Sequence, residues 1–179
     1  MNTFKSLITI ALGVTSGLAL ADEPPINEHV SVSWESPEDY TDVRAANQSR
    51  KRFMEQTFHR FDDYFASLAQ RFPDDYQWNI KVTNVDLAGQ VWPSSFVGLG
   101  QGGQDVRLIK DIDIPRMSFS YKLLSNGELV KEADVDLKDM GFLQRSLHGS
   151  DTDPLRYEKR MLKEWFNREF SDYLITAKQ

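Results

Sequence analysis

Hydrophobic and polar residues follow two spacings along this chain of 179 residues. Apolar residues at every second position, as in Val30, Val32 and Trp34, are typical of a strand with one buried face. Apolar residues three and four positions apart are typical of a helix that buries one side. The pattern predicts the order strand, helix, strand, strand, strand, helix. The predicted segments are a strand at 30–34, a helix within 47–71, strands at 77–85, 106–114 and 117–123, and a final helix starting at 153.

Each predicted strand has one polar face, and each predicted helix has one apolar stripe. This combination indicates an α+β fold, a two-layer sandwich in which an antiparallel sheet of about four strands carries two helices on one face. Asp153 is the expected N-cap of the final helix, with Pro154 as its first residue. The length and the absence of internal repeats predict a single α+β domain over residues 29–179.

The Asn126-Gly127 pair marks the turn of a hairpin. A two-residue loop there would pair Phe119 with Asp134, which places an acid beside a core aromatic. A three-residue loop, Ser125-Asn126-Gly127, would pair Phe119 with Ala133 instead. Because a slip of one residue turns every side chain to the other face, the hydrophobic pattern favours the three-residue loop.

The first 21 residues have the pattern of a secretory signal peptide. Lys5 supplies a short positive region, Leu7–Leu20 is largely apolar, and Ala19-Leu20-Ala21 supplies the small residues of a cleavage site. An uncleaved anchor is the alternative, but the apolar span is shorter than the about 20 residues that cross a bilayer. We expect cleavage after Ala21, a flexible leader over residues 22–28, and no transmembrane anchor after cleavage.

Composition narrows the classes of function. The 21 basic and 27 acidic residues give a formal charge of −6, which becomes −7 when Lys5 is removed with the signal. An acidic chain is a poor match for a general nucleic-acid binder. Because the chain has no cysteine, disulfides, thiolate metal sites and a lipid-modified cysteine are excluded. An exported chain without cysteine fits the bacterial periplasm better than a eukaryotic secretory pathway.

Cofactor and catalytic motifs have little support. Gly98–Gly103 contains the dinucleotide pattern G-x-G-x-x-G, but a strand is predicted to follow it where a helix is needed, so it is interpreted as a flexible loop. His29, His59 and His148 lack the spacing of a zinc site, and there is no G-x-S-x-G motif. The sequence therefore predicts no cofactor, no metal and no catalytic residue, and it favours a protein that is not an enzyme.

Asp111 and Asp113 are the most suggestive acidic pair. Residues two apart on a strand point the same way, so these carboxylates could hold one hard cation such as Ca²⁺, with Asp86 as a third member. Solvated carboxylates are the simpler interpretation, and the sequence favours it.

A run of cations, Arg50-Lys51-Arg52, stands at the start of the first predicted helix, where positive charge opposes the helix dipole. The simpler explanation is that the helix begins earlier, near Asp42. The alternative is that Arg44, Arg50 and Arg52 bind an anion or an acidic partner surface. Asp42 and Asp86 could also neutralise these arginines within the fold.

Four segments resemble a family of exported proteobacterial proteins that is catalogued as domain of unknown function 3016. The likeness covers most of the chain after the signal, and it implies an exported single domain without implying an activity. The segments are Tyr40-Thr-Asp-Val-Arg44, Asn84-Val-Asp-Leu-Ala-Gly89, Asp113-Ile-Pro-Arg116 and Tyr157-Glu-Lys-Arg-Met-Leu-Lys-Glu-Trp-Phe166.

These observations favour a soluble periplasmic binding or accessory domain without enzymatic activity, which uses its polar sheet face or its glycine-rich loop. Its expected partner is an envelope protein or a small anionic ligand. One alternative is a metal-assisted envelope hydrolase that uses Asp86, Asp111 and Asp113, and another is a protein inhibitor or chaperone-like partner. The candidate binding residues are Arg44, Arg50, Arg52, Asp86, Asp111, Asp113 and Arg116.

Overall fold

The computed structural model describes residues 29–100, 103–144 and 152–175. The predicted signal peptide at 1–21 and the predicted leader at 22–28 lie outside the described residues. In the part that is described, no helix is long and apolar enough to cross a membrane.

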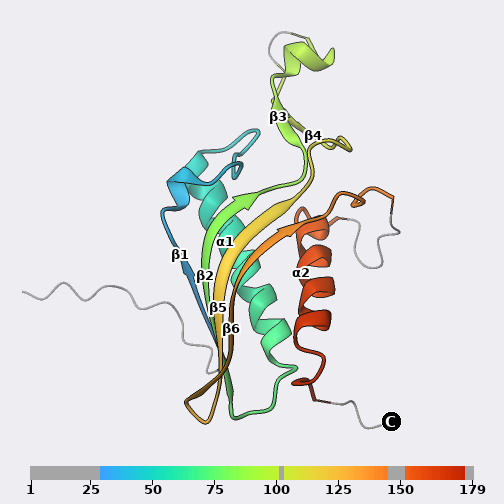
Figure 1. Cartoon of the computed structure of the whole chain (residues 1–179). Coiled ribbons are helices and arrows are strands. Elements are labelled where there is room, and N and C mark those ends of the chain that lie inside the picture. Colours follow the sequence, from blue (N-terminus) through green and yellow to red (C-terminus); the bar gives the residue numbers. More distant parts are fainter. Residues whose placement is uncertain (1–28, 101–102, 145–151, 176–179) are drawn as a thin grey trace, which may run out of the picture.

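The main sheet has four strands in the order β1-β2-β5-β6 (Figure 1). They are β1 (Val30–Trp34), β2 (Tyr76–Asp86), β5 (Arg116–Ser125) and β6 (Glu128–Lys138). β2, β5 and β6 are antiparallel neighbours, whereas β1 runs parallel to β2. The predicted α+β class is confirmed, but the sheet is mixed where an antiparallel one was expected. The cause is α1 (Arg50–Ala69), because a helix between two adjacent strands returns the chain in the same direction.

Both helices, α1 and α2 (Arg156–Glu169), pack on the same face of the main sheet (Figure 1). The fully buried Trp78 of β2 contacts Phe65 of α1 at 5.6 Å between ring centroids and Trp165 of α2 at 6.2 Å. Phe119 of β5 contacts the same two aromatic rings. The predicted two-layer arrangement and the apolar stripes of both helices are therefore confirmed.

The start of α2 lies two residues later than predicted. Leu155 is its N-cap, since a turn at Pro154 and Leu155 precedes the helix. Asp153 still binds this end of the helix, because its carboxylate accepts a hydrogen bond from the Leu155 N–H at 2.8 Å and pairs with Lys159 at 2.7 Å. Partial burial works against ionisation, but these two donors lower the pKa of Asp153.

The hairpin between β5 and β6 has the two-residue turn that the hydrophobic pattern disfavoured, and Phe119 has neither of the two partners considered from the sequence. Asn126 and Gly127 have φ of 52° and 80°, so they form a two-residue turn, and the predicted three-residue loop is wrong. A bulge follows at once, because Val130 has no partner residue on β5. This extra residue restores the alternation, and Phe119 therefore faces Val135 where Ala133 was predicted.

A second, two-stranded sheet projects beyond one end of the main sheet (Figure 1). It consists of β3 (Gln90–Trp92) and β4 (Val106–Leu108), and η2, a 3₁₀ helix at Ser94–Val97, follows β3. We call these three elements the arm. The predicted strand over 106–114 is wrong beyond Leu108, since the Asp113 N–H donates to the Lys110 carbonyl and closes a turn there. A shorter 3₁₀ helix, η1 (Pro37–Asp39), follows β1.

Candidate functional site

A polar cleft of about 570 Å³ lies where the arm leaves the main sheet. Its lining comes from three segments that are far apart in sequence, within residues 41–45, 86–91 and 112–116. The first segment leads toward α1, the second joins β2 to β3, and the third leads into β5. Four of the predicted binding residues, Arg44, Asp86, Asp113 and Arg116, meet at this cleft.

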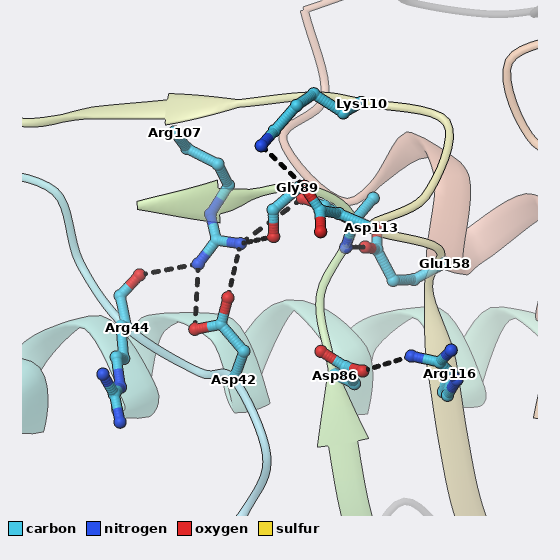
Figure 2. Close-up of polar contacts among 10 residues, drawn as sticks. Asp42, Arg44, Asp86, Gly89, Arg107, Lys110, Asp113, Arg116 and Glu158 are labelled. Carbon is cyan, nitrogen blue, oxygen red and sulfur yellow. Dashed lines mark hydrogen bonds and ion pairs between the residues drawn. The ribbon is translucent and has the colours of Figure 1, made fainter. Parts of the chain in front are cut away.

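Asp86 and Arg116 form an ion pair across the end of the sheet. They are opposite residues of β2 and β5, and Arg116 Nη1 donates to Asp86 Oδ2 at 2.8 Å (Figure 2). The Asp86 side chain is 15% exposed and that of Arg116 is 48% exposed. Burial raises the pKa of Asp86, and the Arg116 guanidinium opposes that rise. The guanidinium therefore has a bound side and a side that is open to solvent.

Arg107 of β4 joins the arm to the segment that leads toward α1 (Figure 2). Its guanidinium donates to both carboxylate oxygens of Asp42, at 2.9 and 3.3 Å. It also donates to the backbone carbonyls of Gly89 and Arg44, each at 2.9 Å. Asp42 thus neutralises Arg107, and the expectation that it neutralises Arg44, Arg50 or Arg52 is wrong. Sequence reasoning missed Arg107, whose signal was a lone cation between the apolar residues of a short strand.

Asp113 is held at the cleft by its backbone more than by its side chain. Its carbonyl accepts a hydrogen bond from the Gly89 N–H at 2.9 Å. Its side chain is only 13% exposed, and its buried Oδ2, 3.6 Å from Lys110 Nζ, accepts no hydrogen bond from any described residue. Lys110 also lies over the Trp92 ring, 4.4 Å from its centroid. The Asp113 carboxylate therefore keeps unused capacity to accept hydrogen bonds.

Glu158 of α2 binds the backbone of the segment that joins β2 to β3 and lines the cleft. One carboxyl oxygen accepts a hydrogen bond from the Ala88 N–H at 2.7 Å, and the other has no partner among the described residues. Full burial raises the pKa of Glu158, while the Ala88 N–H and the nearby Arg107 charge act in the opposite direction. Sequence reasoning missed this residue too, although a charged residue within an apolar helix stripe is a signal that it holds a buried contact.

Arg44 supplies the free cation of the cleft. Its backbone carbonyl is bound by Arg107, whereas its exposed guanidinium makes no hydrogen bond or ion pair with any residue that the structure describes. Arg44 and Arg116 both line the cleft, on opposite sides of Asp42 and Asp86, and the guanidinium of Arg44 points away from these carboxylates (Figure 2). This donor arrangement suits a carboxylate or a phosphate, which a guanidinium can bind through two parallel hydrogen bonds.

The other predicted residues lie elsewhere. Helix α1 begins at Arg50 with Ser49 as N-cap, so the prediction that it starts near Asp42 is wrong. Arg50 donates to the Glu38 carbonyl at 2.5 Å, and Arg52 lies in the first turn of α1; neither lines the cleft. Asp111 is exposed on the turn before β5 and does not line it either.

The acidic residues do not gather as a metal-assisted mechanism requires. Asp86 is paired with Arg116, Asp113 with Lys110, and Asp111 lies outside the cleft. Across residues 29–100, 103–144 and 152–175, no group of three His, Asp or Glu side chains could hold a metal ion. The glycine-rich segment is followed by a strand, β4, as predicted. It therefore does not lead into the helix N-terminus that binds a pyrophosphate in dinucleotide-binding folds.

One comparison with known proteins gives a match. The model of the family described as "Protein of unknown function (DUF3016)" matches residues 28–168. No curated protein and no solved structure matches the chain.

Proposed function

This chain belongs to that family of unknown function, and on this premise we propose that it is a binding domain without enzymatic activity that works in the bacterial periplasm. We infer that its cleft holds a small anionic ligand between Arg44 and Arg116. The carboxylate or phosphate group of such a ligand would take up the guanidinium N–H groups that the protein leaves open.

The observation that carries the proposal is the free guanidinium of Arg44. The acidic groups beside it, Asp42 and Asp86, already have their own cations in Arg107 and Arg116. Because these pairs neutralise one another, the charge that remains for a ligand is that of Arg44. Its backbone is fixed through the Arg107 hydrogen bond, so the side chain starts from a defined position.

The size of the cleft agrees with a small ligand. Its volume of about 570 Å³ falls within the about 300–1,000 Å³ that small-molecule sites usually have. Each hydrogen bond between a guanidinium and an anionic group contributes roughly 1.5–3 kcal/mol when the site is shielded from water. Arg116 is half exposed, which places its contribution at the lower end of that range.

The proposed location rests on the amino-terminal sequence. Lys5, the apolar stretch and the small residues before Ala21 form a signal pattern, and the chain lacks cysteine throughout. A core rich in buried aromatic side chains, with Trp78 at its centre, gives the domain its packing without any disulfide.

Amide chemical-shift mapping tests the binding site. Succinate is titrated into the ¹⁵N-labelled protein at low ionic strength, and phosphate is titrated in parallel. We expect the largest shifts in residues 41–45, 86–91 and 112–116. Shifts confined to the first turn of α1, around Arg50 and Arg52, or no shifts at all, would contradict the proposal.

The arm supports a second candidate, the protein-partner role. Phe96 in η2 is 76% exposed and Leu99 just beyond it is also exposed, so the arm presents two apolar side chains that a protein partner could cover. Crosslinking of the mature protein in a periplasmic extract tests this role. A partner recovered with the wild-type protein and lost with Phe96→Ser would support it, and equal recovery with both proteins would count against it.

A further inference from the structure

Resting on the proposed function, we propose that the ligand of the cleft is a zwitterion, a free amino acid or a short peptide. Its ammonium group lies at Asp113 and its carboxylate lies at Arg116, which Figure 2 shows nearer to Asp113 than the Arg44 guanidinium. The proposed function requires only an anionic group on the ligand, whereas this inference adds a site for a positively charged group at the other end of the same molecule.

The state of the Asp113 carboxylate is the first argument. Only 13% of the Asp113 side chain is exposed to solvent, and a carboxylate that is this buried normally accepts several hydrogen bonds. Its buried Oδ2 lies 3.6 Å from Lys110 Nζ, beyond hydrogen-bond distance, and accepts no hydrogen bond from any described residue. Because Lys110 faces Oδ2, a cationic donor that enters the cleft would bind the other oxygen, Oδ1.

The placement of the charges is the second argument. In Figure 2, Asp113 lies above Asp86 and Arg116 lies beside Asp86, while Arg44 lies beyond Asp42 with its guanidinium turned away. The acidic acceptor toward the arm is thus separated from the Arg116 guanidinium at the end of the sheet. Asp86 bonds Arg116 through Oδ2, so its other oxygen is a second acceptor between them. Separate poles of opposite charge match the two ends of a zwitterion.

An organic ammonium fits these acceptors better than a metal ion does. Ca²⁺ takes about 6–8 oxygen ligands, which must converge on one point. An ammonium group has three donors and is satisfied by two or three separate acceptors. In the described part of the chain no acidic group of three converges, whereas Asp113 and the free oxygen of Asp86 provide separate acceptors.

Two peptides that differ only in their amino terminus test the inference. Triglycine carries an ammonium and a carboxylate, and N-acetyl-triglycine carries the carboxylate alone. Amide-shift titrations at pH 7 give the affinity of each peptide for the wild-type protein, Asp113→Asn and Asp111→Asn. Asp111 is the matched control because it is two residues away and outside the cleft. The amide spectrum also reports whether each variant is folded.

We expect the wild-type protein to bind triglycine about tenfold more tightly than N-acetyl-triglycine, since one charge-assisted contact is lost on acetylation. Asp113→Asn removes this preference, and Asp111→Asn retains it. Equal affinities for the two peptides, or a preference that survives Asp113→Asn, would overturn the zwitterion inference while leaving the anion site in place. If neither peptide, succinate nor phosphate shifts the cleft residues, both the inference and the proposed function are wrong.

Discussion

Glu158 shows how one buried carboxyl connects the core to the cleft. Its side chain is completely buried on α2, and it bonds the Ala88 N–H immediately before the cleft residue Gly89. Because burial raises its pKa, the neutral form is the one that the fold favours. The stability that this proton provides is present below the unfolded-state pKa and is lost as pH rises through the higher pKa of the folded state.

We therefore predict that Glu158→Gln raises the free energy of unfolding at neutral pH relative to the wild-type protein. The amide keeps an oxygen for the Ala88 N–H and removes the cost of a buried charge, which is at least about 1 kcal/mol. Urea denaturation between pH 4 and pH 9 measures the effect, with Glu55→Gln on the exposed side of α1 as the control. A Glu158→Gln variant that is less stable than the wild-type protein at every pH would show that the charged form is required.

The residues of the site were only partly predictable. Asp113 was singled out as a member of an acidic pair with Asp86 as a third carboxylate, and these two residues and Arg116 stand in segments that resemble the family. The partner of each was not predictable, since Asp86 meets Arg116 through the register of β2 and β5. Arg107 was overlooked because its strand was assigned to the main sheet, and its contacts with Asp42 depend on the position of the arm.

At the scale of elements, the junction between the arm and the sheet depends on Gly89. Its φ is 78°, and a Cβ there would lie 2.2 Å from the Leu108 carbonyl oxygen on β4. Gly98, at the end of η2, has the same φ of 78° with open space around it. Alanine substitutions at these two positions therefore share the energetic cost of a positive φ, and only the one at Gly89 adds the cost of a steric clash with β4.

We predict that Gly98→Ala lowers the free energy of unfolding by only about 1 kcal/mol, the cost of a left-handed conformation for alanine. Gly89→Ala has the same cost and must also displace β4, so we expect a loss of at least about 2–3 kcal/mol. Chemical denaturation gives both values, and hydrogen exchange of the β3–β4 amides shows whether the arm has moved. Equal losses in the two variants would mean that the approach of Gly89 to Leu108 is not a constraint.

Elements with a strong periodic pattern were predicted well. The stripe that includes Phe61 and Phe65 located α1, and the alternation through Trp78 and Ile80 located β2. Alternation could not reveal the bulge at Val130, because one extra residue changes the register without changing the local pattern. It also misled at 109–114, where a turn that happens to alternate resembles a strand.

At the scale of the whole molecule, the α+β layers followed from the pattern, while the cleft did not. Both helices had one apolar stripe, so their placement on one face of a sheet was required by burial. The cleft forms only because segments near 42, 88 and 113 converge at one end of that sheet. Such convergence depends on long-range contacts like those of Arg107, whose partners a local sequence pattern does not identify.

Export is a property of the whole chain, and it leads to a prediction about processing. The protein recovered from the periplasm of a bacterial host should begin at Asp22, because Ala19 and Ala21 provide the small residues that a signal peptidase requires. Mass spectrometry of the purified protein measures the new terminus. Ala21→Arg should leave the precursor uncleaved, and a full-length wild-type protein in the cytoplasmic fraction would contradict export.

The most direct measurement of the anion site is the affinity of succinate for two arginine variants, determined by calorimetry at low ionic strength. Arg44→Gln removes the free guanidinium of the cleft, and Arg52→Gln removes an equal charge from the first turn of α1. The predicted result is an affinity at least about tenfold lower for Arg44→Gln and within about twofold of the wild type for Arg52→Gln. Equal losses in the two variants would show only a general effect of charge, and they would contradict a binding site at Arg44.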